Sequence, residues 1–137
     1  MMRLDLIPPE LAGEVWPEVE SYIASALERE GREHIPSQVL KSIQSGAMQL
    51  FIVRDDRDVA IAAAVVAIHE YQDVKRCRVH WCGGTGVEKW IHLLSGIEDW
   101  AKAKGCEMVK VTGRDGWLKV LQSHGWEKQG VILGKRL

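Results

Sequence analysis

Residues 75–91, KRCRVHWCGGTGVEKWI, contain the change of pattern that decides the fold of this chain. Up to Cys82, apolar and polar residues alternate as they do in a half-buried β-strand. The glycine-rich segment GGTG at 83–86 interrupts this strand, and from Val87 apolar residues recur at helical spacing until Gly105. The stretch therefore predicts a strand, a glycine-rich turn and a long helix, in that order.

Three strands are predicted before the end of this turn, because runs of apolar and β-branched residues cover 48–53, 59–71 and 75–82. Short polar turns connect these strands, which favours an antiparallel meander. Further upstream, the pattern predicts a strand over 2–7 and two helices. The first helix begins at Leu11 and is expected in two pieces because of Pro17, and the second runs from Pro36 to Gly46.

After the long helix, the sequence predicts a buried strand over 108–112 and a short helix over 117–125. A final hairpin is expected from 126–129 and 131–135. The order βααβββαβαββ predicts a single α/β (α+β) domain over residues 1–137 with a mixed central sheet. A helix between neighbouring strands makes a right-handed parallel crossover, so strands 75–82 and 108–112 should be parallel and splayed at the glycine turn.

Composition excludes several classes of function. Eighteen Lys and Arg balance nineteen Asp and Glu without a long block of either sign, which argues against nucleic acid as a partner. The longest apolar runs fall well short of the roughly 20 residues that cross a bilayer, so no membrane segment is expected. The first residues do not resemble a secretion signal, which predicts a cytoplasmic protein. Three cysteines without paired spacing predict neither a disulfide nor a metal site.

This order of elements resembles the GNAT superfamily of N-acetyltransferases along all 137 residues. The segment 84–86 is similar to the family's loop for the pyrophosphate of coenzyme A, and residues 124–126, HGW, resemble its usual ending. The resemblance extends to small GNAT-like proteins of phages and prophages. It implies transfer of an acetyl group from acetyl-CoA to an unknown amine. The alternative is a non-catalytic GNAT-fold module that binds a partner or dimerises, such as a phage accessory or assembly protein.

The glycine turn is the candidate cofactor site. Glycines allow close backbone approach, and free N–H groups at a helix start attract phosphate, although the same glycines could simply make a tight turn. The residues that the resemblance places at the cofactor are Trp81, Cys82, Gly83, Gly84, Thr85, Gly86, Val87 and Arg114. The family usually has Arg or Gln at the position of Trp81, and Glu88 would repel a pyrophosphate. We therefore expect weak coenzyme A binding, with a Kd no better than about 100 μM.

The candidate general bases are His80 and Glu70, which lie on the strands beside the expected cleft. Each has a structural alternative, because His80 could be a hydrogen-bonded histidine of the sheet and Glu70 a solvated strand end. Cys82 as a nucleophile lacks a recognisable partner. Many family members carry a tyrosine that protonates the departing thiolate at the position where this chain has Leu121. The six tryptophans are either core anchors or part of a self-association surface, so a homodimer is a further expectation.

Overall fold

A five-stranded mixed sheet organises the chain, and the computed structural model describes residues 1–31, 33–113 and 115–137. The strands lie in the order β1-β2-β3-β4-β5, and each of the first four is antiparallel to its neighbours among them. β4 and β5 are parallel, as the crossover predicts. Their bounds are Arg3–Ile7 for β1, Gln49–Arg54 for β2, Ala60–Tyr71 for β3, Val74–Gly84 for β4 and Met108–Val111 for β5.

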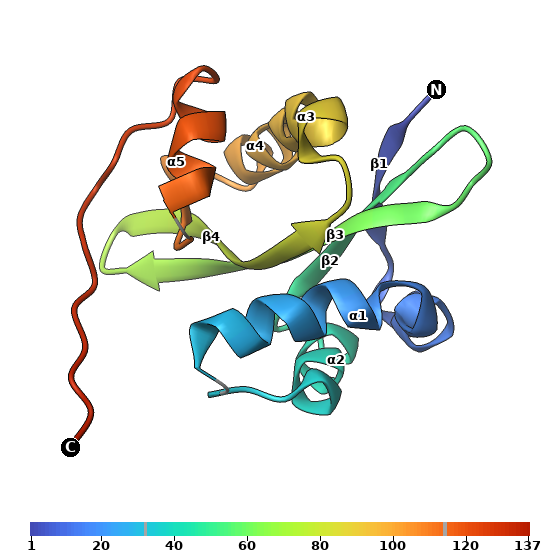
Figure 1. The fold of residues 1–137 in the computed structure, drawn as a ribbon, viewed down its shortest axis with the longest axis horizontal. Helices are drawn as coiled ribbons and strands as arrows, with labels where there is room; N and C mark the ends of the chain where they lie inside the picture. Colours follow the sequence, from blue (N-terminus) through green and yellow to red (C-terminus); the bar gives the residue numbers. More distant parts are fainter. Residues whose placement is uncertain (32, 114) are drawn as a thin grey trace.

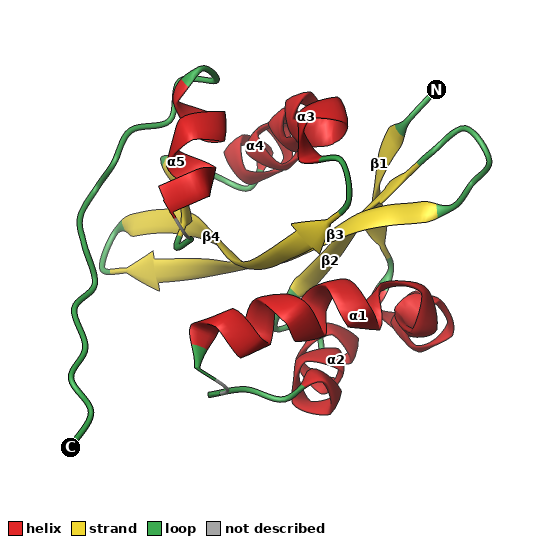
Figure 2. Cartoon of the chain, in the orientation of Figure 1, coloured by secondary structure: helices red, strands yellow, loops and turns green. Residues whose placement is uncertain are grey.

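Helices cover both faces of this sheet (Figure 1, Figure 2). The 3₁₀ turn η1, α1 and α2 pack on one face, which we call the α1 face, and their bounds are Pro9–Leu11, Ala12–Glu30 and Pro36–Gln44. The opposite α4 face carries α3 (Val87–Trp90), the 3₁₀ turn η2 (Ile91–Leu94), α4 (Ser95–Ala103) and α5 (Asp115–Gln122). None of the helices in the described ranges has the length and hydrophobicity of a membrane-spanning helix.

α1 is one continuous helix, so the expected break at Pro17 is wrong. Pro17 lies in the second turn, where its missing N–H removes one backbone hydrogen bond and its ring faces the carbonyl of Gly13, a residue without a side chain. The buried residues Trp16, Val19 and Ile23 keep their spacing across the proline. The continuous apolar face therefore outweighs the local cost of Pro17.

The helix expected from Val87 to Gly105 is divided into α3, η2 and α4. Trp90 ends α3 because its side chain turns inward, where it is 1% exposed and donates a hydrogen bond from Nε1 to the carbonyl oxygen of Thr85 at 2.8 Å. The tighter 3₁₀ turn that follows allows the consecutive residues Trp90 and Ile91 both to be buried. The periodicity identified the face that packs on the sheet but not this change of helix type.

The expected C-terminal hairpin is absent, because residues 126–137 form no strand. Figure 1 shows this segment as an extended trace that runs past the end of the β3–β4 hairpin. Val131, Ile132 and Leu133 are 68%, 75% and 89% exposed. Consecutive apolar residues form a strand where helices cover both faces of the sheet, as at residues 50–53 of β2, whereas residues 131–133 are exposed and lie outside the sheet. Their hydrophobicity alone therefore did not predict a strand correctly.

Candidate functional site: a split between β4 and β5

β4 and β5 separate after the first part of their pairing. The parallel register runs from Arg76 opposite Met108 to Val79 opposite Val111, whereas β4 continues to Gly84. Within the described residues, the backbone of residues 80–84 therefore has no partner strand on the β5 side. This is the splay that the sequence predicts, and it opens a split through the sheet.

A β-bulge in β4 lies at the start of this split. Val79 is opposite Val66 and Trp81 is opposite Val65, so His80 is an extra residue without a partner of its own on β3. Val79 packs in the core on the α4 face, and Trp81 packs in the core on the α1 face. The alternation expected along 75–82, with Cys77, Val79 and Trp81 on one side, is wrong at this point because the bulge moves Trp81 to the other face.

The α4 side of the split contains a small apolar cavity of about 20 Å³. This volume holds roughly one water-sized group, and an apolar lining favours a methyl group over water. Burial raises the pKa of the Cys82 thiol to about 12, so this wall residue stays protonated and is no nucleophile at neutral pH. The cavity is lined by Val79, Cys82, Leu94, Ile97, Val109, Val111, Trp117, Leu121 and Trp126.

Two glycines of the turn are explained by close packing. A Cβ atom on Gly83 would lie 2.6 Å from the carbonyl oxygen of Tyr22 in α1, and one on Gly84 would lie 2.6 Å from that of Ile61 in β3. The Thr85 N–H donates a hydrogen bond to the same Ile61 oxygen at 2.9 Å. Gly83 and Gly84 therefore have a structural reason to be glycine, whatever the turn binds.

Gly86 and the first residues of α3 provide the part of the turn that suits an anion. Gly86 adopts the left-handed conformation, with φ 63° and ψ 49°, at the N-cap of α3. The N–H groups of Val87 and Glu88 have no intrahelical acceptor because they lie in the first turn. α3 has only four residues, so its dipole is small, and Glu88 adds a negative charge beside it. Lys89 is the neighbouring cation, while Arg114 lies outside the described residues.

On the α1 side of the split, His80 forms a hydrogen bond with a second histidine. The Nε2 atoms of His80 and His69 are 3.0 Å apart, so one ring donates and the other accepts. Ala67 lies between them in the strand register and has only a methyl side chain, which leaves the rings free to meet. The bulge and this small neighbour together bring β3 and β4 histidines into contact.

The end of α1 completes the polar surroundings of His80. The Trp81 indole Nε1 donates a hydrogen bond to a carboxylate oxygen of Glu30, and the other oxygen of Glu30 is 2.9 Å from Nδ1 of His34. Glu30, Glu33 and His34 place their ligand atoms within 4.8 Å of one another, but all three residues are exposed. Glu30 accepts the hydrogen bond from Trp81 and contacts His34, so both of its carboxylate oxygens are engaged by protein groups.

The pKa of His80 is lowered from its ordinary 6.5 to about 4. Burial is the largest cause, because it disfavours the charged ring, and the electrostatic effects of His69 and Arg78 lower the pKa further. Glu30 acts in the opposite direction, and His34 contributes a smaller lowering. His80 is therefore neutral, and able to accept a proton, throughout the neutral pH range.

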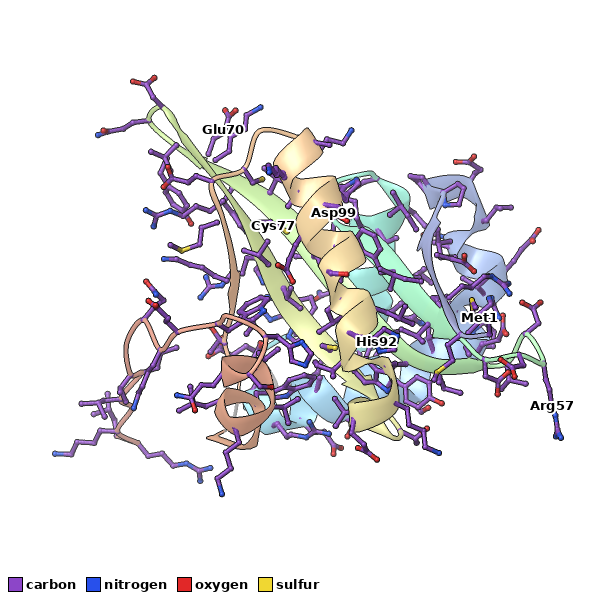
Figure 3. All side chains as sticks on the ribbon, turned by 90° about the horizontal axis from the view of Figure 1, so that it is seen from above. Met1, Arg57, Glu70, Cys77, His92 and Asp99 are labelled. Carbon is purple, nitrogen blue, oxygen red and sulfur yellow. The ribbon has the colours of Figure 1, made fainter. Side chains whose placement is uncertain are left out.

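The second candidate base, Glu70, does not meet His80. It lies near the turn of the β3–β4 hairpin, where Figure 3 labels it. Its strand partner is Lys75, and its carboxylate forms an ion pair with that lysine at 3.4 Å. Lys75 precedes His80 by five residues, which corresponds to about 16 Å along a strand. The side chain of Glu70 is 63% exposed, as expected for a solvated strand end.

Sequence reasoning did not identify His69 and Glu30 as neighbours of His80. The two-residue turn at Gln72-Asp73 places His69 opposite Arg76, which would leave the histidines two rows apart on the sheet. Only the bulge and the neighbouring alanine bring them together, and neither is visible in one strand alone. The contact of Glu30 with Trp81 depends on where α1 ends, a boundary that periodicity locates only to within a few residues.

No protein-family model and no curated protein matches the sequence. Solved structures do match its fold. An aminoglycoside acetyltransferase, meta-AAC0020, from an uncultured soil metagenomic sample in complex with sisomicin has a TM-score of 0.75 at 13% identity, with 99% of this chain and 96% of that chain covered. The aminoglycoside N-acetyltransferase AAC(6')-Iy in complex with CoA gives 0.67 at 19% identity, over 100% and 95% of the two chains.

Glucosamine-6-phosphate N-acetyltransferase from Arabidopsis thaliana gives a TM-score of 0.70 at 11% identity, over 99% of this chain and 98% of that chain. At these identities the matches concern the fold alone, and they extend over nearly the whole length of both chains in each comparison. The mixed sheet with its helices on both faces is thus an instance of a known fold. The chain has the fold of the GNAT superfamily of N-acetyltransferases.

Proposed function

We propose that this protein transfers an acetyl group from acetyl-CoA to an amine. The observation that carries the proposal is the split between β4 and β5, which has a methyl-sized apolar cavity on the α4 side and a neutral histidine on the α1 side. A thioester and an amine could therefore approach the same opening from opposite faces of the sheet. The acetyltransferases among the structures that share this fold support the same reading.

In this proposal, acetyl-CoA lies along the unpaired edge of β4. The backbone N–H and C=O groups of residues 80–84 provide partners for the amide groups of the pantetheine arm, as an added strand would. The apolar cavity receives the acetyl methyl group, and its small volume disfavours longer acyl chains. The free N–H groups of Val87 and Glu88, with the side chain of Lys89, contact the phosphates. Gly86 permits this approach, while Trp81 and Cys82 through Thr85 shape the rest of the binding edge.

His80 acts as the general base. Among the described residues, no group forms a hydrogen bond with Nδ1 of His80, whereas Nε2 is occupied by His69. The amine nitrogen attacks the thioester carbonyl carbon, its proton passes to Nδ1 of His80, and the carbon–sulfur bond breaks to release the thiolate of coenzyme A. Leu121 stands in the cavity wall where the related fold often has an acidic tyrosine, so water protonates the thiolate.

The first test is direct binding and turnover. We expect calorimetry to give a Kd for acetyl-CoA near or above about 100 μM, since the phosphates meet one exposed cation and few backbone donors. Gly86→Asp should abolish that binding, because it adds a negative charge and a side chain at a left-handed position. Release of the coenzyme A thiol in the presence of an amine panel measures turnover, and butyryl-CoA should react more slowly than acetyl-CoA. Absence of both binding and turnover at millimolar acetyl-CoA would favour the non-catalytic module.

A second test identifies the base. His80→Ala should lower kcat roughly a hundredfold, the usual contribution of a positioned base. The matched variant Glu70→Ala should change kcat by less than about threefold, since Glu70 is solvated and paired with Lys75. A loss below about threefold for His80→Ala would remove His80 from the mechanism, and a hundredfold loss for Glu70→Ala would make that residue the base instead.

A further inference from the structure

A second pocket, of about 160 Å³, lies on the α1 face near the turn end of β3 and β4. Three of the side chains around it are cations, although the chain as a whole has a net charge of −1. Strand alternation places these cations on one face, where like charges on neighbouring strands repel each other. The pocket is lined by His69, Tyr71, Arg76, Cys77, Arg78 and Lys110.

The cations of this pocket have donors that the protein leaves free. Nε of Arg76 is buried and, among the described residues, has no hydrogen-bond partner. The other end of this guanidinium reaches one carboxylate oxygen of Glu107 at 3.4 Å. Arg78 donates from Nη2 to the hydroxyl of Thr112 at 3.2 Å and forms no ion pair with a described side chain. A buried donor without an acceptor is costly, so this pocket favours a ligand that brings one.

The chemistry of the donors selects an anion. A guanidinium presents N–H groups in a planar fork that matches the oxygens of a carboxylate or a phosphate, and Lys110 adds a further charge. Arg76 precedes Gly84 by eight residues, about 26 Å along the strand, so this pocket is far from the turn at which coenzyme A phosphates would bind. An anion in this pocket must therefore be a different group from the coenzyme A phosphates, which would bind at the glycine turn.

The pocket adjoins the proposed base. His69 lines it and forms the hydrogen bond with His80, and Arg78 lies two residues before His80, or about 7 Å along β4. We propose that the acceptor is a small amine that carries a carboxylate or a phosphate a few bonds from its nitrogen. The anionic group binds Arg76, Arg78 and Lys110, and the amine then lies at His80. This inference rests on the proposed acetyl transfer and specifies its substrate class.

Matched pairs of acceptors test the inference. With acetyl-CoA as donor, we expect kcat/KM for phosphoethanolamine to exceed that for ethanolamine, or that for β-alanine to exceed that for propylamine, by at least about tenfold. The pair with the larger ratio shows whether phosphate or carboxylate is preferred. The double variant Arg76→Gln/Arg78→Gln should bring the ratio close to one while the KM for acetyl-CoA changes little. Arg57→Gln removes a charge from the distant β2–β3 turn and should leave the ratio intact (Figure 3).

A binding experiment separates failure of this inference from failure of the proposed function. Titration with inorganic phosphate, followed by NMR of the histidine rings, should shift the resonances of His69 and His80, and the double variant should lose the shifts. Acetylation without preference for anionic amines would overturn the inference and leave the acetyltransferase standing. If no amine is acetylated, the proposed function fails, and the phosphate titration still decides on the pocket. Unchanged histidine resonances at high phosphate would overturn it.

Discussion

His80 is held in surroundings that oppose its protonation. Burial is the main cause, His69, His34 and Arg78 oppose a positive charge on the ring, and Glu30 offsets only part of this effect. A base with a pKa of about 4 is fully available at neutral pH but accepts a proton with less driving force than an ordinary imidazole. An anion bound beside Arg78 would raise this pKa, so a substrate of the proposed class would itself strengthen the base.

The lowered pKa of His80 makes folding stability depend on pH. Between pH 6.5 and about 4, the unfolded state binds a proton at this residue that the folded state does not, so the free energy of unfolding falls as the pH falls through this window. We therefore expect urea unfolding to show that the free energy of unfolding falls more between pH 7 and pH 4.5 for the wild type than for His80→Gln. His92→Gln, at an exposed histidine, should keep the wild-type loss. Equal losses in the wild type and His80→Gln would contradict the lowered pKa.

Gly83 tests how closely α1 approaches the sheet. An added methyl group would lie 2.6 Å from the backbone oxygen of Tyr22, which cannot move without displacing the helix. We expect Gly83→Ala to lower the free energy of unfolding by about 1–3 kcal/mol, the usual cost of overpacking. Gly130→Ala is the control, because no atom lies within 4 Å of its added Cβ. Thermal and urea unfolding measure both, and a neutral Gly83→Ala would show that α1 can shift.

The attachment of α1 to the strands also depends on one buried cation. Arg54, at the end of β2, donates two hydrogen bonds to the carboxylate of Glu18 in α1 at 3.0 and 3.3 Å. It also donates to the carbonyl oxygen of Asp58 in the β2–β3 turn at 3.0 Å and lies 3.8 Å from the carboxylate of Asp5 in β1. This side chain therefore connects α1 with β1, β2 and the β2–β3 turn.

Replacement of Arg54 should destabilise the protein although a cation is removed from its interior. We expect Arg54→Met to cost about 1–3 kcal/mol, because the carbonyl of Asp58 and the carboxylate of Glu18 lose their donors. Arg57→Met, at an exposed position in the same turn, should stay within about 0.5 kcal/mol of the wild type. Chemical unfolding measures both variants, and equal stabilities would mean that Arg54 contributes only packing.

Some elements could be predicted from the sequence and others could not, for physical reasons. The parallel pairing of β4 and β5 was predictable, because a strand, a glycine turn and a helix leave only one favourable crossover. The bulge at His80 was not, since it is a relation between two strands, and neither strand alone contains it. Of the two candidate bases, His80 lies at the split, whereas Glu70 lies near the hairpin turn and forms an ion pair with Lys75.

Considered as a whole, the described fold is complete without its last residues. Residues 131–137 are exposed and belong to no strand or helix, so they add little buried apolar surface to the core. Deletion of 131–137 should therefore change the melting temperature by less than about 2 °C, as expected for a difference below about 0.5 kcal/mol. Calorimetry of the two chains measures this. A large loss of stability would mean that the segment pairs with the sheet in solution, as the hairpin expected from 126–129 and 131–135 would.

The bulge in β4 has a consequence for changes in chain length. If residue 80 were deleted, Val79 and Trp81 would become consecutive, and each would still point to the face that it occupies now. All five strands could keep their partners, so loss of a single codon would yield a folded protein with a regular β4. The same deletion would remove the imidazole and the distortion where the split begins. In this molecule, one extra residue separates a sheet with a regular β4 from a sheet that carries the proposed base at its split.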